Sequence, residues 1–256
     1  MKIVVAIKQV PARDSQLRID GNGKWIQEAD LTFEINEPDA YALEEALQLK
    51  EKHGGEVIAL CLGPSRATST IREALAKGAD RALHIEEENL NALDTLGIAK
   101  LLAKAIEPEK PDLVLTGLQS DDLGSGQTGV VVAELLGWAS STIIMKVEVI
   151  AGGIQVKREL EDGWFQNIEL PLPAVLTIQS GITKLRYATL IGIKKAKSKE
   201  IKVLSPATLG GAPTPVAVLD RLYLPQKSKQ TQILEGPAKE VAAKLVEKLK
   251  FEVRVI

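Results

Sequence analysis

The segment DLVLTGLQSDDLGSGQTG, residues 112–129, decides the fold of this chain. Its first residues, 112–116, form a mostly apolar run that is typical of a strand buried on both faces of a sheet. Gly117 and a polar loop follow, and the sequence after Gly129 predicts a helix. Because ligands of open α/β sheets bind at the carboxyl ends of the strands, this loop lies where a ligand is expected.

The chain before this segment repeats the same order of strand and helix. Asn36 is the expected N-cap of the first helix, and Gly54 and Gly55 mark its end. Such alternation implies βαβ crossovers and an open, mostly parallel sheet with helices on both faces, a Rossmann-like α/β fold. The predicted strands span residues 3–7, 56–62 and 81–85, and the predicted helices span residues 40–53, 67–77 and 95–106.

The pattern changes after residue 147. Strand-like runs at 154–160, 164–170 and 174–178, separated by Gly152-Gly153 and Asp162-Gly163, predict an antiparallel addition to the sheet. After residue 193 come a lysine-rich run and then several prolines and glycines, the composition of an extended arm. We therefore expect an α/β domain at 1–193 and a C-terminal arm at 194–256 that lies on another surface.

The composition excludes several classes of function. The 256 residues hold one cysteine, two histidines and three each of Trp, Tyr and Phe, too few for an iron–sulfur cluster or a structural zinc site. A formal charge of −2 and 4% aromatic residues argue against nucleic-acid binding. The first apolar run is too short for a signal peptide, and no stretch is long enough to span a bilayer. The sequence predicts a cytoplasmic protein without membrane insertion.

The loop itself has the composition of a phosphate-binding turn. Gly124, Gly126 and Gly129 let backbone amides approach a ligand, and Ser125 and Thr128 add hydroxyl groups where a helix begins. The segment matches neither the Walker loop nor the dinucleotide fingerprint, because no lysine follows the last glycine and the glycine spacing differs. From these residues alone, a solvent-exposed loop capped by Ser125 or Thr128 remains an equal alternative.

The other chemically notable residues favour structural roles. Asp121 and Asp122 have the types needed for a metal pair or for acid–base catalysis, but adjacent acids before a glycine turn are usually solvated or capping. Cys61 stands in an apolar strand, where a small buried hydrophobe is the default. His53 and His84 are expected to pack or to face a helix dipole. The sequence therefore holds no conventional catalytic constellation, and we do not expect an enzyme.

Several motifs together resemble the β subunit of electron transfer flavoprotein. The resemblance covers most of the chain, and the more specific parts are its last two blocks, the LVLTGLQS…GQTG loop and the stretch from VKRELEDG to LRYATLIGIKKAKSK. The chain departs from the family pattern at residues 183–185, where Thr183-Lys184-Leu185 stands in place of the usual Asn-x-Pro before Arg-Tyr. The matching stretches are VAIKQVP, NEPDAYALEEALQLKE, GPSRATSTIREALAKGADRALHI, LVLTGLQS with GQTG, VKRELEDG, LPLPAVLTIQ and LRYATLIGIKKAKSK.

The resemblance implies a heterodimer with a homologous α subunit, carrying electrons from flavin dehydrogenases to a quinone oxidoreductase or another acceptor. It further implies an FAD held mainly by the α subunit, a structural AMP in this chain that makes residues 1–193 an adenine-nucleotide-binding domain, and an arm that wraps the α subunit. The positions that match the AMP contacts of the family are Ala6, Asn36, Glu37, Pro38, Asp39, Cys61, Leu118, Asp121, Asp122, Gly124, Ser125, Gly126, Gln127, Thr128 and Gly129.

Two further roles follow from the resemblance. The docking loop for partner dehydrogenases matches residues 186–195, where Leu190 takes the place of the hydrophobic anchor and Arg186, Tyr187, Lys194 and Lys195 flank it. Without the resemblance, Leu190 would be interpreted as a core leucine at a strand end. Arg13 occupies the stretch that lies near the flavin in the family, where a cation would stabilise a reduced anionic flavin.

Three alternatives remain open. A bifurcating branch of the family holds a second FAD in place of the AMP, although the GQTG ending looks more like the AMP type. A stand-alone adenine nucleotide sensor of the universal-stress type shares the strand and helix order, but it has no use for the long apolar arm. An enzyme that makes or cleaves adenylates would need a catalytic group in the loop, which offers only Asp121 and Asp122.

Overall fold

Strand β1 (Lys2–Ala6) lies inside a nine-stranded sheet and is completely buried at its three central residues. The structure is a computed structural model that describes residues 1–225 and 231–255. β1 pairs in parallel with β4 (Glu56–Gly63) on one side and with β6 (Leu113–Gly117) on the other. The order across the sheet is β11 (Ile201–Leu204), β5 (Arg81–Glu86), β4, β1, β6, β10 (Ala174–Ile178), β7 (Ala139–Ile150), β8 (Gly153–Glu159) and β9 (Phe165–Pro171).

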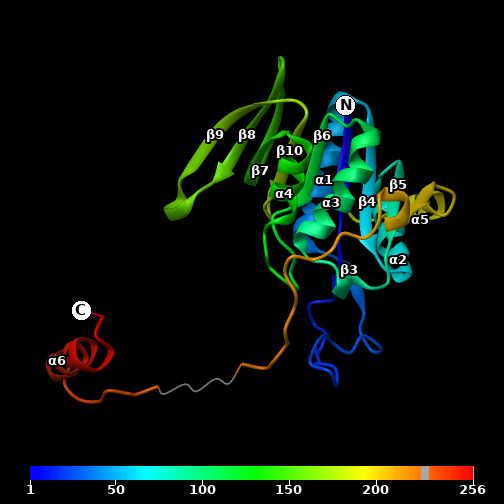
Figure 1. Ribbon diagram of the computed structural model, residues 1–256. Coiled ribbons are helices and arrows are strands. Elements are labelled where there is room, and N and C mark those ends of the chain that lie inside the picture. Colours follow the sequence, from blue (N-terminus) through cyan, green and yellow to red (C-terminus); the bar gives the residue numbers. More distant parts are fainter. Residues whose placement is uncertain (226–230, 256) are drawn as a thin grey trace. The chain divides into compact units, whose positions relative to one another are not determined.

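Helices cover both faces of the parallel part of this sheet (Figure 1). Side chains alternate between the faces along a strand, so Ile3 and Val5 pack with α1 and α2 while Val4 packs with α3 and α4. The helices are α1 (Glu37–His53), α2 (Thr68–Lys77), α3 (Thr95–Ile106), α4 (Thr128–Leu136) and α5 (Leu190–Ala196), and a separate hairpin joins β2 (Gln9–Pro11) to β3 (Phe33–Ile35). The predicted fold class and the strands and helices predicted before residue 117 are confirmed, with small shifts at their ends.

Two predictions for the later strands were incomplete or wrong. Residues 174–178 were assigned to the antiparallel addition, but β10 lies between β6 and β7 and is parallel to both. All five of its residues are buried, which is typical of a strand inside a parallel sheet. Strand β7 was not predicted before residue 147, because the polar residues Ser140, Ser141 and Thr142 interrupt its apolar pattern. The antiparallel addition therefore consists of β7, β8 and β9.

The first compact unit continues beyond the predicted boundary at residue 193, to Leu222. This happens because β11 pairs in parallel with β5 and because α5 packs on α2. Gly192 permits that packing, since a Cβ there would lie 2.3 Å from the carbonyl oxygen of Ala76. Whether residues 194–256 wrap a partner stays a prediction.

The second unit, Tyr223–Ile256, contains helix α6 (Ala238–Lys248) and a π-helical turn (Leu249–Val253). Several of its large apolar side chains are exposed, among them Val246 and Phe251. Within the described residues, no helix combines the length and apolarity that crossing a membrane requires.

Helix α1 buries two carboxyl groups whose ionisation opposes folding, Asp39 and Glu45. Glu45 is only 8% exposed, and burial together with the Glu44 carboxylate raises its pKa from 4.5 to about 7. Between those two values the folded state holds a proton that the unfolded state releases. The free energy of unfolding must therefore fall as pH rises through this window.

We expect the substitution Glu45→Gln to remove this loss. The variant should match the native chain near pH 4 and have the higher unfolding free energy above pH 7. Between these pH values, the difference in unfolding free energy between the two chains should grow by at most about 1.4 kcal/mol per pH unit. Urea unfolding across pH 4–8 would measure it. Glu51→Gln is the control. The hydrogen bond from Arg186 lowers the pKa of Glu51, so ionised Glu51 stabilises the fold, and this variant should lose stability at neutral pH. Identical pH profiles for Glu45→Gln and the native chain would contradict the prediction.

Candidate functional site

The site forms where the direction of the sheet's strand order changes. The chain passes from β1 to β4 and β5 on one side, and then returns to add β6 on the other side of β1. The carboxyl ends of β1 and β6, at Ala6 and Gly117, therefore flank a topological switch point. Open α/β sheets bind ligands in the crevice at this position.

Asp39, in the first turn of α1, joins the two strand ends. One carboxylate oxygen accepts the amide of Lys8 at 2.8 Å, and the other accepts the amide of Gly117 at 2.8 Å. The approach requires a glycine, because a Cβ on Gly117 would lie 2.3 Å from the Asp39 carboxylate. Burial raises the pKa of Asp39 to about 7 despite these hydrogen bonds, which act in the opposite direction.

Asn36 holds the loop after β6 against the start of α1. Its side-chain amide donates to the carbonyl of Gln119 at 2.9 Å, and its side-chain oxygen accepts the amide of Asp121 at 2.9 Å. Asn36 is the N-cap residue of α1, as predicted, but its side chain forms no capping hydrogen bond, since both of its polar atoms bind the distant loop instead. Asn36 is 1% exposed, so these bonds satisfy a buried amide.

Lys8 carries the positive charge of the switch point, which sequence reasoning missed. Its ammonium group lies 2.7 Å from the Asp122 carboxylate and 3.3 Å from the Ser120 hydroxyl. Burial acts to raise the pKa of Asp122, but the Lys8 charge and the hydrogen bonds outweigh it and hold that pKa below its ordinary value. The sequence feature that could have revealed this charge is a lysine directly after the first predicted strand, residues 3–7.

Arg13 forms a second charged group at the mouth of the site. Its guanidinium pairs with the carboxylate of Glu37 and lies 3.4 Å from that of Asp121. The sequence placed these residues in separate motifs, and the structure brings them together. Lys8 and Arg13 together therefore face three carboxylates, so neither cation is left without a partner.

The glycine loop leads into α4 as expected. Gly124 and Gly126 have φ angles of 62° and 63°, where a side chain would be strained. Gly129 lets α4 lie close to the sheet, since its Cβ would meet Thr116 Oγ1 and Thr177 Cγ2 at 2.6 Å. Gln127 occupies the N-cap position, and within the described residues no side chain caps this helix, neither Ser125 nor Thr128. The first amides of α4 therefore keep their capacity to bind a ligand.

The remaining predicted site residues lie along the same sheet edge. Ala6 and Leu118 are half-buried where β1 and β6 end, and Pro38 is buried beside Asp39. Cys61 lies within β4, completely buried. Burial, with the nearby Asp39 carboxylate, raises the pKa of the Cys61 thiol to about 12, so any contact with a ligand would come from its backbone.

The predicted docking loop presents apolar side chains to solvent. Leu190 begins α5 and is 80% exposed, which excludes the alternative of a core leucine at a strand end. Tyr187 and Ile191 are also exposed, and Lys194 and Lys195 follow on the same short helix. We refer to these five residues as the α5 surface.

Arg186 does not belong to that exposed surface. Its guanidinium donates to the buried carboxylate of Glu44 at 2.8 and 2.9 Å, and to Glu51 at 2.6 Å. Thr183, at the position that departs from the family pattern, accepts a hydrogen bond from Gln48 at 2.6 Å. Both residues thus fasten the segment before α5 to helix α1.

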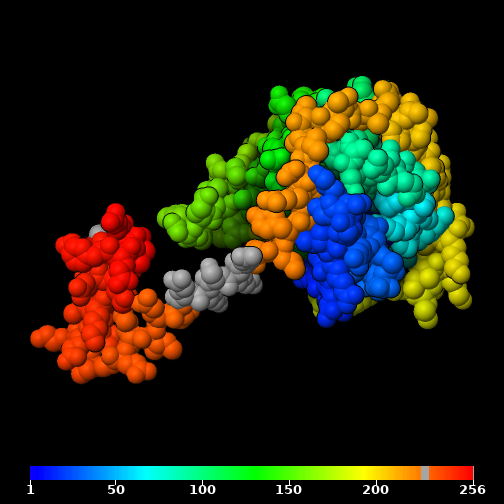
Figure 2. Space-filling view, turned by 60° about the horizontal axis from the view of Figure 1, so that its bottom comes forward, coloured from blue at the N-terminus to red at the C-terminus, as the bar shows by residue number. Residues whose placement is uncertain are grey.

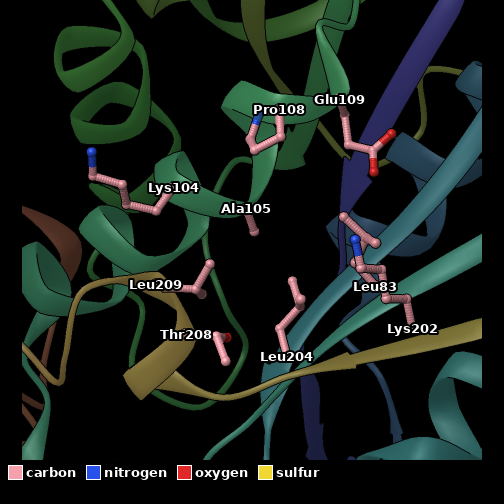
Figure 3. Close-up of a pocket in the computed structure, with 9 residues that line it drawn as sticks. All are labelled: Leu83, Lys104, Ala105, Pro108, Glu109, Lys202, Leu204, Thr208 and Leu209. Carbon is pink, nitrogen blue, oxygen red and sulfur yellow. The ribbon is translucent and has the colours of Figure 1, made fainter.

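Two hollows lie elsewhere on the described surface, and neither is lined by the switch-point residues. One, of about 300 Å³, lies beyond the ends of β4 and β5 and includes Arg66, which pairs with Glu28 at 2.9 Å. The other, of about 210 Å³, lies between α3 and β11, with Leu83, Ala105, Leu204 and Leu209 facing it and Lys104 and Lys202 at its rim (Figure 3).

Comparison with known proteins finds one family throughout. The family model described as "Electron transfer flavoprotein domain" matches residues 24–209. A protein of Methylophilus methylotrophus is 37% identical over 96% of this chain and 97% of its own length, and one of Homo sapiens is 37% identical over 98% and 97%. A protein of Bradyrhizobium diazoefficiens is 37% identical over the full length of both chains. All three relatives are named electron transfer flavoprotein subunit beta.

Replacing Asp39 should separate the two strand ends. In Asp39→Asn the amide keeps one acceptor oxygen but turns a donor toward the second backbone N–H, so we expect a loss of about 1–3 kcal/mol in unfolding free energy near pH 4. The loss should shrink as pH rises toward 8, because the raised pKa of Asp39 makes its ionisation oppose folding in the native chain. Urea unfolding measures the loss. Asp121→Asn is the control, because its carboxylate forms only an exposed ion pair worth less than about 1 kcal/mol. Equal losses in the two variants would contradict the bridging role of Asp39.

Proposed function

The chain belongs to the family of electron transfer flavoprotein β subunits, and on that premise we propose that it pairs with an α subunit to carry electrons from flavin dehydrogenases to a quinone oxidoreductase or another acceptor. In this proposal the chain is a carrier subunit without substrate turnover of its own. The observation that carries the proposal is the convergence of the family's nucleotide motifs on one switch point, with the glycine loop opening onto the start of α4.

The residues present fit an adenine nucleotide. The amides at the start of α4 and the open backbone of Gly124–Gly129 suit a phosphate, because a helix N-terminus carries partial positive charge. The acidic residues suit the other end of the nucleotide, since carboxylates accept hydrogen bonds from ribose hydroxyls. Lys8 faces Asp122, and Arg13 is shared between Asp121 and Glu37, which reduces the repulsion of the phosphate by these acids. We therefore assign AMP to this crevice.

The flavin is shared with the α subunit in this proposal. FAD supplies the reversible uptake of electrons, a chemistry that protein side chains lack. The contribution of this chain is one wall of the flavin site, with Arg13 on the hairpin side of the switch point. Its guanidinium is already paired with Glu37 and Asp121, so its position is fixed while 61% of its side chain stays exposed. An exposed, oriented cation suits a flavin that becomes anionic on reduction.

The α5 surface is the proposed contact with flavin dehydrogenases. An exposed leucine beside a tyrosine and an isoleucine supplies apolar area, and lysines on the same helix attract an acidic partner. Arg186 acts indirectly here, by holding the preceding segment on α1. The exposed apolar residues of the second unit suit a stable contact with the α subunit. The cytoplasmic location remains a prediction.

Cofactor content tests the proposal directly. The heterodimer, purified and denatured, should release one FAD and one AMP, measured by chromatography. Two FAD and no AMP would support the bifurcating alternative, and nucleotide without flavin would support the sensor. The substitution Gly126→Ala should lower the AMP recovered and leave FAD in place, because it strains the loop at a positive φ.

Gly152→Ala is the matched control for that variant. Gly152 also has a positive φ, 85°, but it lies in the turn between β7 and β8 with open space around its Cβ position. Both substitutions should cost about 1 kcal/mol or more in unfolding free energy. Only Gly126→Ala should lose AMP. Equal AMP content in the two variants would place the nucleotide elsewhere.

Leu190 should dominate the contact with a flavin dehydrogenase. We expect Leu190→Ala to raise the KM for the heterodimer in the dehydrogenase assay by about tenfold with little change in kcat, since the side chain supplies binding rather than chemistry. Leu135→Ala is the control, an exposed leucine on α4 away from the α5 surface. A KM unchanged in Leu190→Ala, or raised equally in Leu135→Ala, would contradict this role.

A further inference from the structure

The segment that leads into the arm, residues 213–222, is held in place by this chain alone. It belongs to the first compact unit, where it passes the start of α3 and then the turn at Asp20–Lys24. Figure 2 shows this orange segment lying along the blue residues near the N-terminus. We call residues 213–222 the lead segment.

Asp94 is the first anchor of the lead segment. One carboxylate oxygen accepts the amide of Gly97 at 2.7 Å and so caps helix α3. The other oxygen accepts the amides of Val216 at 2.8 Å and Ala217 at 3.0 Å. The bond from Gly97, followed by those from the lead segment, holds the pKa of Asp94 below its ordinary value. A charged acceptor therefore binds both a helix end and the lead segment.

A second anchor lies at the end of the lead segment. The amide of Leu222 donates to the carbonyl of Gly23 at 2.7 Å, and the Lys24 ammonium donates to the carbonyl of Asp220. The segment already lies against α3 at its first residue, since Pro213 Cβ is 3.6 Å from where a Cβ on Gly97 would stand. The course of the chain is thus fixed on both sides of residues 218–219.

We propose that Asp94 is a positioning residue for subunit assembly: it fixes the lead segment on this chain, so that the point where the arm departs, at Tyr223, is set before the α subunit binds. This inference rests on the proposed function in that the arm's partner is the α subunit. A segment already ordered loses less conformational entropy on association, and the affinity rises accordingly. The helix cap alone would not require the bonds to Val216 and Ala217.

Amide hydrogen exchange of the full chain, without any partner, tests the anchor. Asp94→Asn keeps a good N-cap for α3 but turns a donor toward the two amides, whereas Asp94→Ser keeps a cap and removes the contact with the lead segment. In both variants we expect the amides of Val216 and Ala217, followed by NMR, to exchange about tenfold faster or more, while the amides of α3 keep their protection.

Asp80→Asn is the matched control. The Asp80 carboxylate also accepts a backbone amide, that of Val57 at 2.8 Å. It binds the Lys50 ammonium as well, and neither of these partners belongs to the lead segment. This variant should leave exchange at Val216 and Ala217 unchanged. Unchanged exchange in the Asp94 variants, or equal acceleration in Asp80→Asn, would overturn the anchor.

Titration with the α subunit then tests the positioning role. We expect the Asp94→Ser chain to bind the α subunit about threefold to tenfold more weakly than the native chain, with Asp80→Asn unaffected. Equal affinity of the Asp94→Ser and native chains would overturn the positioning role even if the anchor exists. If the native chain binds no α subunit, the proposed function fails, and the exchange experiment still decides the anchor by itself.

Discussion

The carboxylate of Asp39 is the interaction on which the rest of the site depends. It satisfies two buried amides, at the ends of β1 and β6, that the sheet leaves without partners where the strands stop. Because the acceptor sits in the first turn of α1, the same contact fixes where that helix begins relative to the sheet. Gly117 is the complementary requirement, since only a residue without Cβ leaves room for the carboxylate. The position of the glycine loop follows from that junction.

Local pattern was sufficient for most of the fold and insufficient for the partners of polar side chains. Buried parallel strands such as β6 and capped helices such as α3 carry their signal in adjacent residues, so the sequence predicted them. β7 was missed because its serines and threonine mask an otherwise apolar strand. Asn36 was correctly predicted as an N-cap residue, but its side-chain partners were missed because they lie 83 and 85 positions away, and a short polar residue before a helix looks the same whichever partner it binds.

The site and the α5 surface differ in how their charges are compensated. At the switch point, Lys8 faces Asp122 and Arg13 faces Glu37 and Asp121, and Asp39 is buried between strand ends. Such pairing fixes the side chains and leaves no excess positive charge, since two cations face three carboxylates. On the α5 surface, the lysines extend into solvent beside exposed apolar groups. The first arrangement suits a ligand that stays bound, and the second suits a partner that arrives and leaves.

The lone thiol of the chain is not placed for redox chemistry. A redox-active cysteine requires a stabilised thiolate and access to solvent. Cys61 has neither, because burial and the Asp39 carboxylate both disfavour its ionised form. The buried carboxylate that joins the ends of β1 and β6 thus adds to the effect of burial in keeping Cys61 protonated. Organising the switch point and disfavouring the thiolate are two results of one buried carboxylate.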